Sequence, residues 1–355
     1  MTSQPFHGVL VPVLTPFAPS GEPDSGRFIA FCRWLLDQGA GGLSVFGTTS
    51  EANSMSGPER MALLDALIDA GIPPEKLMPG TGACSTSEAA SLVRHAVGHG
   101  CGGVLMLPPF YYKGVSDDGI FAFVSRVIDE VASPALRVYL YHIPPVAQVG
   151  YSLDLVGRLI KAYPETVVGL KDSSGDWSNT AALLDRFPGF AIFPGSEVFL
   201  LDALRKGGAG CITASGNVNV PGIRKVYENW RGPQAEGLQA EITTLRKVLQ
   251  AYPMVPALKR IVAHFHKDPG WAAVRPPLVP LDQAQSSALI ADLAKLGFTL
   301  GERLEHARQH IHAARGDGPR DDGAERTGRG REGSRQRENP RADHRADYHR
   351  GQREQ

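Results

Sequence analysis

Two kinds of segment alternate along residues 8–296 of the chain. Short, almost entirely apolar runs are typical of strands buried on both faces, and longer segments with apolar residues every three or four positions indicate amphipathic helices. The expected strands are 8–17, 42–46, 77–80, 103–107, 137–141, 167–171, 190–194 and 210–213. Strands of this kind that alternate with helices predict an α/β protein with a (β/α)8 TIM barrel.

The predicted helix starts and the composition of the C-terminal segment define the expected domains. Ser56 and Ser85 are each followed three residues later by a glutamate, which predicts helix entrances of the capping-box type. Further helical patterns occupy 222–230, 239–250, 256–266 and 286–296. We therefore expect the barrel at 1–220 and a helical C-terminal appendage at 221–300. Because residues 316–355 contain no Val, Ile, Leu, Met, Phe, Trp or Cys, we expect 301–355 to be a disordered polar tail.

The charge balance and the cysteines narrow the class of protein. Lys plus Arg and Asp plus Glu both number 37, so the formal net charge is zero, and neither nucleic acid nor an acidic membrane surface is an expected partner. The polar N-terminus and the lack of a ~20-residue apolar run favour a cytoplasmic protein. Four cysteines without C-x-x-C spacing indicate reduced side chains rather than disulfides or a zinc site.

One lysine stands where an apolar strand ends. Lys171 closes the run 167–171 and is followed by small and acidic residues that predict a turn into a helix. Burial disfavours the charged amine, so we expect its pKa to fall well below the ~10.4 of a free lysine, which suits a nucleophile. The alternative is a lysine that only extends its amine from the strand end into solvent.

Polar side chains at the ends of other strands decide between these alternatives. Thr48 and Thr49 follow the second strand, Tyr111 follows the fourth, and Tyr141 ends the fifth. The C-terminal ends of the strands form the catalytic face of such barrels, so these groups and Lys171 are expected to share one mouth. Their coincidence favours the nucleophile.

This set of groups predicts chemistry on a 2-oxo acid. A lysine amine attacks a carbonyl carbon, and the resulting iminium withdraws electrons from the neighbouring carbon. Tyr141 is able to donate and accept the protons of these steps, with Thr48 as a relay. Backbone N–H groups of 47–51, with the Thr49 hydroxyl, form a candidate carboxylate site. For Thr48 and Thr49, an ordinary role in a turn remains the alternative.

Three motifs carry a resemblance to a known family. They are Gly47-Thr48-Thr49-Ser50-Glu51, Tyr141-His142-Ile143-Pro144 and Gly169-Leu170-Lys171-Asp172-Ser173-Ser174-Gly175-Asp176. In this order they resemble the signatures of the dihydrodipicolinate synthase / N-acetylneuraminate lyase family, and the resemblance covers residues 6–298. The likeness implies a homotetramer built of tight dimers, with no metal or organic cofactor.

The resemblance also implies roles for single residues. Lys171 would be the Schiff-base lysine for pyruvate, Tyr141 the acid/base and Thr48 its relay. Thr49 would bind the carboxylate, and Ile212 would line the pocket through its backbone. Tyr111 resembles the tyrosine that family members insert across the dimer contact into the neighbouring site.

Departures from the family pattern bear on the substrate. The synthases have a glycine and then an arginine that grips the aldehyde's carboxylate, where this chain has Pro145 and Val146. Ser50 replaces a glycine, so a positive φ there would strain the backbone and the hydroxyl would contact substrate. His142 replaces an asparagine, and either binds a substrate hydroxyl or packs at the strand end.

We therefore predict a pyruvate-dependent class I aldolase or lyase. Its substrates would be pyruvate with an aldehyde, joined as a 4-hydroxy-2-oxo acid or a 2-keto-3-deoxy sugar acid. One alternative is 4-hydroxy-tetrahydrodipicolinate synthase, which condenses pyruvate with aspartate semialdehyde. The other is a non-catalytic barrel that only binds a keto acid.

Two weaker signals complete the sequence picture. Asp172 and Glu197 are near the lysine and are secondary candidates to Tyr141 as general bases. His95 and His99 stand four residues apart on a helix, a spacing that binds metals. We expect that helix on the barrel exterior, and no acidic residue accompanies the two histidines in their four-residue repeat. No metal role is therefore predicted.

Overall fold

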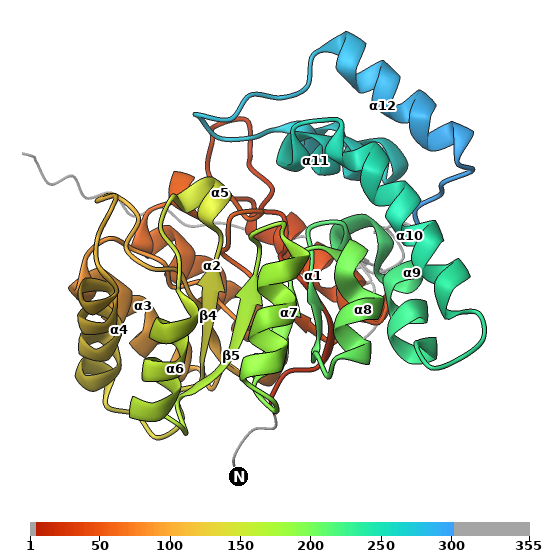
Figure 1. The fold of residues 1–355 in the computed structure, drawn as a ribbon. Coiled ribbons are helices and arrows are strands. Elements are labelled where there is room, and N and C mark those ends of the chain that lie inside the picture. The colour runs from red at the N-terminus through yellow and green to blue at the C-terminus, as the bar shows by residue number, and fades with distance from the viewer. Residues whose placement is uncertain (1–4, 302–355) are drawn as a thin grey trace, which may run out of the picture. The chain divides into compact units, whose positions relative to one another are not determined.

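Parallel strands form the centre of the computed structural model, which describes residues 5–301 (Figure 1). The strands are β1 (Gly8–Val11), β2 (Gly42–Leu43), β3 (Val104–Met106), β4 (Val138–His142), β5 (Val167–Asp172), β6 (Ala191–Pro194) and β7 (Gly210–Ile212). They pair in the orders β2-β1-β7 and β3-β4-β5-β6, and every pair is parallel. The predicted tail, apart from Gly301, lies outside the described residues.

The segment 77–80 closes one gap between the two sheets. It forms isolated parallel bridges from Leu77 to Leu43 and from Gly80 to Leu105. Met78 N–H donates to Leu43 O at 2.9 Å, and Pro79 O accepts from Leu105 N–H at 2.9 Å. Pro79 has no N–H of its own, which explains why this third expected strand makes an incomplete ladder.

The other gap is closed where β6 meets β7. Ala209 N–H donates to Ile192 O at 3.0 Å and so joins the two strands. All eight expected strand positions therefore exist, and the predicted (β/α)8 barrel is confirmed.

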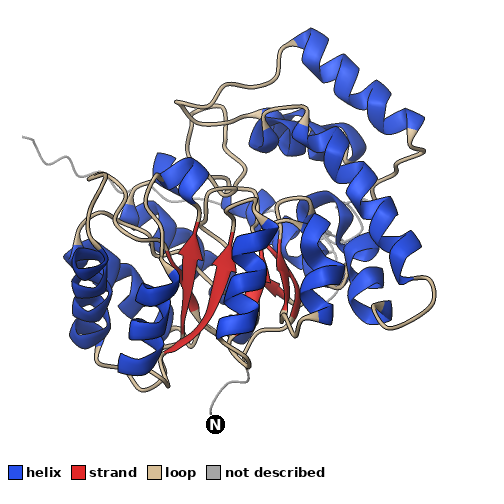
Figure 2. Ribbon diagram, viewed as in Figure 1, coloured by secondary structure: helices blue, strands red, loops and turns tan. Residues whose placement is uncertain are grey.

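Helices cover the outer face of the strands (Figure 2). The helices of the barrel are α1 (Ser25–Asp37), α2 (Gly57–Asp69), α3 (Thr86–Gly98), α4 (Asp117–Val131), α5 (Pro144–Ala147), α6 (Leu153–Ala162), α7 (Trp177–Arg186), α8 (Leu200–Arg205) and α9 (Gly216–Asn229). Four 3-10 turns are η1 (Ala52–Ser54), η2 (Pro74–Lys76), η3 (Glu197–Phe199) and η4 (Pro269–Ala272). Ser56 forms the full capping box with Glu59, whereas Ser85 accepts from Glu88 N–H without the return bond.

The C-terminal helices continue directly from the barrel. They are α10 (Ala235–Gln250), α11 (Met254–Phe265) and α12 (Gln283–Lys295), and α10 packs against α9. Helix α9 runs across residue 220, the expected domain boundary, with a non-helical Asn219 just before Pro221. No helix within residues 5–301 is long and apolar enough to cross a membrane.

Alternation along the strands decides which side chains enter the barrel. In β4, Tyr139 and Tyr141 belong to the inner apolar cluster, while Leu140 belongs to the cluster between strands and helices. The same period of two places Leu170 of β5 in the outer cluster, so Lys171 beside it faces the interior. Tyr139 of β4 is linked to the segment before β1, because its hydroxyl accepts a hydrogen bond from Phe6 N–H at 2.9 Å.

A buried ion pair ties the loop after β2 to α11. The side chains of Glu51 and Lys259 form this pair, and both are fully buried. The Lys259 ammonium also donates to Ala273 O at 2.7 Å and lies 4.4 Å from the centroid of the Phe17 ring. Arg275 N–H donates to the second Glu51 oxygen at 2.8 Å. Burial lowers the pKa of Lys259 to about 8, which outweighs the attraction to Glu51.

Replacing Lys259 with methionine is expected to destabilise the fold by about 3–5 kcal/mol, because the Glu51 carboxylate would be left buried without a counter-charge. Denaturant unfolding of the purified protein measures the change. The matched control is the double variant Glu51→Gln/Lys259→Met, which removes both charges and should recover most of the loss. A single variant within about 0.5 kcal/mol of the wild type would contradict this account.

Candidate active site

Lys171 and Tyr141 lie side by side on neighbouring strands. They are register partners of β5 and β4, and each is only 4% exposed. The Lys171 ammonium lies 4.4 Å from the centroid of the Tyr141 ring. The amine is thus held inside the barrel rather than extended into solvent, which disfavours the alternative considered for Lys171.

The phenol of Tyr141 connects onward to the loop after β2. Its hydroxyl lies 3.2 Å from Thr48 Oγ1, and either oxygen is able to donate in this hydrogen bond. Lys171 thus packs on the face of the Tyr141 ring, and the hydroxyl of the same ring meets Thr48. This arrangement suits a proton relay between the phenol and Thr48 close to the amine.

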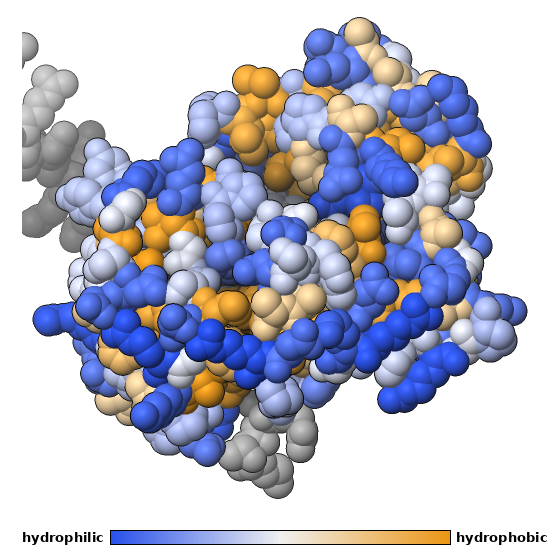
Figure 3. Space-filling model, in the orientation of Figure 1, coloured by the Kyte–Doolittle hydropathy of each residue, from blue (hydrophilic) through white to orange (hydrophobic). Residues whose placement is uncertain are grey.

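A cavity of about 490 Å³ opens beside these residues. Its walls come from the barrel rim and from the helices α10 and α11, and Figure 3 shows the surface hollowed between these parts. The polar lining consists of Thr48, Thr49, Tyr141, Lys171, Asp172, Ser173, Ser196, Arg246 and Gln250. The apolar lining includes Ile143, Val146, Val198, Phe199, Ala214 and Met254.

Hydrogen bonds inside the loop 47–51 reduce the number of N–H groups that are free to bind an anion. The N–H groups of Ser50 and Glu51 donate to Gly47 O and Thr48 O, both at 3.1 Å, and Gly47 N–H donates to Ser50 Oγ at 3.3 Å. Within residues 5–301, the N–H groups of Thr48 and Thr49 have no such partner. Two backbone donors with the Thr49 hydroxyl remain for a carboxylate.

Both carboxylate oxygens of Asp172 accept hydrogen bonds from the turn and helix that follow it. One carboxylate oxygen accepts from Thr180 Oγ1 at 2.6 Å and from Asn179 Nδ2 at 3.1 Å. The other accepts from Ser174 N–H at 3.0 Å. These bonds occupy both carboxylate oxygens and fix the turn that follows Lys171, which favours a structural role for Asp172 over that of a general base.

Arg246 of α10 is a cavity residue that the sequence did not indicate. Its Nη1 lies 3.3 Å from Glu197 Oε2, 3.3 Å from Thr213 Oγ1 and 3.1 Å from Ser215 Oγ. Its Nε is buried without an acceptor, and its side chain is 11% exposed. Glu197, 1% exposed, is thus the anchor of this guanidinium rather than a general base.

Comparison with known proteins agrees with this geometry. The model of the dihydrodipicolinate synthetase family matches residues 5–296. The chain belongs to this family. An uncharacterized DapA-like lyase from Chloroflexus aurantiacus is 33% identical over 286 residues, which cover 80% of this chain and 95% of the relative. A 4-hydroxy-tetrahydrodipicolinate synthase from a Synechococcus species is 32% identical, with 84% and 98% covered.

Solved structures show the same relationship. Dihydrodipicolinate synthase from Agrobacterium tumefaciens superposes with a TM-score of 0.77 at 34% identity, covering 82% of this chain and 99% of that one. The prophage protein YagE from Escherichia coli has a TM-score of 0.75 at 26% identity, with 82% and 99% covered. The protein is therefore a lyase of the dihydrodipicolinate synthetase family.

Ser50, which departs from the family pattern, requires a correction. Its hydroxyl donates to Val13 O at 2.5 Å, the residue is fully buried, and it does not line the cavity. Positive φ angles occur instead at Phe46 (60°) and Glu51 (57°). Ser50 thus holds the loop to the backbone of Val13 without the positive φ angle that would strain it, and its place outside the cavity lining disfavours the expected substrate contact.

His142 and Ile212 are not among the residues that line the cavity. His142 Nδ1 accepts from Tyr151 N–H at 2.9 Å, and burial lowers the pKa of this imidazole. This favours the packing role of the two considered for it. Ile212 is fully buried at the end of β7, and Ala214, two residues on, lines the cavity. The expected contact through the Ile212 backbone remains a prediction.

Tyr111 does not reach the cavity of its own chain. Its ring is 73% exposed and packs edge-to-face on Tyr112, which is 74% exposed, with centroids 5.2 Å apart. Two large exposed aromatic rings at the barrel rim are unusual on a surface that only faces water. The expected role of Tyr111 in a neighbouring site remains a prediction.

Proposed function

We propose that the protein is a class I aldolase or lyase that forms a Schiff base between Lys171 and a 2-oxo acid. The observation that carries the proposal is the packed arrangement of the Lys171 amine, the Tyr141 ring and the Thr48 hydroxyl in one cavity. Imine formation needs an amine as the nucleophile and a nearby group that donates and accepts protons, and a buried amine next to a phenol provides both. Three ordered polar groups of this kind have no role in a barrel that only binds, which disfavours the non-catalytic alternative.

The chemistry in the cleavage direction follows from these groups. Lys171 Nζ attacks C2 of the 2-oxo acid, and the carbinolamine loses water when Tyr141 supplies a proton to the departing hydroxyl. The iminium then accepts the electron pair of the C3–C4 bond as the C4 hydroxyl loses its proton, which releases an aldehyde and leaves an enamine. Protonation at C3 and addition of water free pyruvate and regenerate the amine.

The carboxylate of the 2-oxo acid would bind at Thr48 and Thr49. Their two N–H groups are unused by the loop, and the Thr49 hydroxyl adds a third donor. The relative YagE is described as a complex with pyruvate, which supports a 2-oxo acid of this size as the substrate in the family. Pyruvate trapped with borohydride should therefore add about 72 mass units to the peptide that contains Lys171, since the imine adds about 70 and its reduction adds two hydrogens.

The rest of the cavity favours a polar second component. Ser173, Ser196 and Gln250 offer hydrogen bonds, and Arg246 offers a cation whose Nη2 has no acceptor among residues 5–301. A hydroxylated or acidic chain beyond C4 would satisfy these donors. We propose a 4-hydroxy-2-oxo acid or 2-keto-3-deoxy sugar acid as the substrate class, and a panel of such acids screened for pyruvate release tests it.

A second candidate is 4-hydroxy-tetrahydrodipicolinate synthase. Relatives that carry this name are 28–32% identical to the chain. The arginine of the synthase pattern is absent, and Val146 lines the cavity near its place. Arg246 supplies a cation from another side of the same cavity, which keeps aspartate semialdehyde as a candidate. An assay coupled to the reductase of lysine synthesis decides: turnover with semialdehyde and none with sugar acids would reject the aldolase.

Replacing Arg246 with methionine is expected to lower kcat/KM by about 10–100-fold for substrates with a second carboxylate, because a charge-assisted hydrogen bond of about 1.5–3 kcal/mol is lost. Trapping of pyruvate itself should change little. The double variant Arg246→Met/Glu197→Gln is the control for the carboxylate left unpaired in the single variant. Equal losses for acidic and uncharged aldehydes would show that Arg246 acts only on packing.

We also propose that the protein assembles as a homotetramer built of tight dimers, with Tyr111 in the partner's site. Its exposed ring supports this arrangement. Tyr111→Phe should lower turnover, and a hybrid with Lys171→Ala subunits should regain activity, because one site then holds an intact Lys171 and an intact Tyr111. No regain in hybrids confirmed by mass spectrometry would place Tyr111 outside the neighbouring site.

A further inference from the structure

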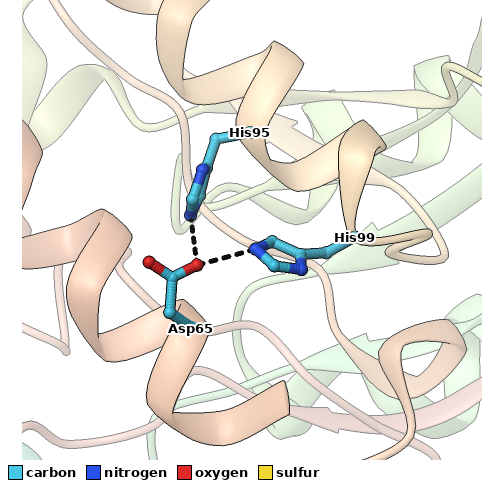
Figure 4. Close-up of side chains that lie close together, drawn as sticks. All are labelled: Asp65, His95 and His99. Atoms are coloured by element: carbon cyan, nitrogen blue, oxygen red, sulfur yellow. Dashed lines mark hydrogen bonds and ion pairs between the residues drawn. The ribbon is translucent and has the colours of Figure 1, made fainter. Parts of the chain in front are cut away.

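Three side chains converge on the outside of the barrel, and none of them lines the cavity. Asp65 of α2 points at His95 of α3 and at His99, the residue that caps that helix (Figure 4). Asp65 Oδ1 lies 2.9 Å from His95 Nε2 and 2.7 Å from His99 Nε2. The neighbouring helix α2 thus supplies the acidic side chain that is missing from the repeat of the two histidines on α3.

The arrangement brings three metal-ligating atoms to one point. All three lie within 4.8 Å of one another, and the imidazole rings meet edge-to-face with centroids 4.8 Å apart. The side chains are half-buried, with exposed fractions of 24% for His95, 30% for His99 and 45% for Asp65. Ligands on two helices are therefore pre-positioned, and their outer side remains open to solvent.

The charges around the cluster do not compete for its ligands. Within residues 5–301, Asp65 has no ion-pair partner other than the two imidazoles. The basic residue next along α3, Arg94, pairs with Glu130 of α4 on the other side. His95 Nε2 also lies 3.3 Å from Met61 O, so one ring has an alternative neighbour and the other has none.

We propose that Asp65, His95 and His99 form a binding site for a divalent transition-metal ion such as Zn²⁺. Imidazole nitrogen and carboxylate oxygen are ligands that this ion takes at about 2.0–2.2 Å. Ligand atoms around a tetrahedral ion at that distance lie about 3.3 Å apart, so the two contacts to Oδ1 need to open by about half an ångström. The two imidazole nitrogens, which lie within 4.8 Å of each other, need to approach to the same separation. Rotation of the half-buried side chains supplies these movements.

The proton balance of binding is simple. In the metal-free cluster each Nε2 carries the hydrogen that it donates to Asp65, and in the complex each Nε2 lone pair faces the ion. The hydrogen of each neutral ring moves to Nδ1. Within residues 5–301 this nitrogen makes no hydrogen bond, and it is not among the buried polar atoms that lack a partner. Binding requires neutral imidazoles, so acid weakens it. One or two water molecules would complete the coordination.

The ion would act as a clamp between α2 and α3 rather than in catalysis. These helices precede and follow the third strand position, which makes only isolated bridges. A metal that binds only the folded state stabilises it in proportion to the logarithm of its concentration. The site therefore offers a metal-dependent gain in stability that is separate from the chemistry at Lys171.

The test uses the full-length protein freed of metal with a chelator and then titrated with Zn²⁺. Because histidines also occur in 302–355, the wild type is compared with His95→Asn/His99→Asn and with His7→Asn as an exposed-histidine control. We expect the double variant to bind one equivalent fewer and to lose a Zn²⁺-dependent rise of several degrees in Tm, while His7→Asn behaves as the wild type.

A second measurement does not depend on folding of the variant. Diethylpyrocarbonate modification of the wild type, followed by peptide mapping, should show His95 and His99 protected when Zn²⁺ is present. Equal Zn²⁺ stoichiometry in wild type and double variant, or modification of both histidines at the same rate with and without Zn²⁺, would overturn the proposal. Trapping of pyruvate at Lys171 reports the proposed function separately, and neither result depends on the other.

Discussion

Lys171→Ala is expected to abolish borohydride trapping of pyruvate and to lower turnover by about a thousandfold or more, because no other amine of the cavity stands beside Tyr141. Mass spectrometry of the reduced adduct and single-turnover assays measure both effects. Since Lys171 is buried among packed residues, its removal leaves space rather than an unpaired charge, so the fold should survive.

A matched control separates the nucleophile from general loss of lysine charge. Lys161 is an exposed residue of α6, and Lys161→Ala should trap pyruvate and turn over as the wild type does. The proposed mechanism fails if Lys171→Ala still forms an adduct elsewhere in the chain and retains turnover. Loss of trapping with retained turnover would instead indicate chemistry that does not pass through an imine.

Tyr141→Phe is the second change with a large expected effect. The phenylalanine keeps the ring beneath the Lys171 amine and removes only the hydroxyl that meets Thr48. General acid–base catalysis typically contributes 10²–10⁴-fold, so we expect a loss of that order in kcat and in the rate of imine formation. The final extent of trapping should remain complete, since the nucleophile is present.

Thr48→Val provides the graded comparison for Tyr141→Phe. If Thr48 relays protons to and from the phenol, the valine variant should be slower than the wild type and faster than Tyr141→Phe. The change in rate should also be smaller when both substitutions are combined than the product of the two single effects. Independent, multiplicative effects would mean that the 3.2 Å contact between the two hydroxyls has no part in proton transfer.

The barrel and its reactive lysine follow from local patterns. Apolar runs of strand length identify the strand positions, and the alternation of side chains within β4 and β5 places Tyr141 and Lys171 on the same side. Because parallel barrels put the C-terminal ends of their strands at one face, these residues meet even though 30 positions of sequence separate them. The ladder at 77–80 departs from the pattern, where Pro79 removes a donor, and β1 and β2 end at Val11 and Leu43, before the expected positions 17 and 46.

Contacts between distant parts of the chain are the features that the sequence does not indicate. Arg246 lies on a helix whose pattern of apolar residues predicts burial of one face, and that pattern gives no sign that a cation beside Ile242 and Leu249 meets the cavity. Glu51 and Lys259 likewise pair across more than two hundred residues, and Asp65 reaches the two histidines only because α2 and α3 pack together. Each depends on tertiary packing, which local periodicity does not encode.

Ser50 shows a different reason for failure. A serine in place of a glycine suggests strain only if that residue takes the positive φ angle, and the loop instead places this angle on Phe46 and Glu51. Its hydroxyl then becomes a bond to the backbone of Val13. Which residue of a turn adopts the left-handed conformation depends on the contacts that hold the turn, here the pair formed by Glu51 and Lys259.

The position of Arg246, Gln250 and Met254 on α10 and α11 has a practical consequence for enzyme design. The amine and phenol that make and break bonds sit on rigid strands, whereas this wall of the pocket comes from helices that can be exchanged without touching either strand. A chimera that takes residues 235–265 from a relative with another acceptor, but keeps Lys259 as the partner of Glu51, should thus inherit that relative's choice of aldehyde while it keeps its own reaction machinery.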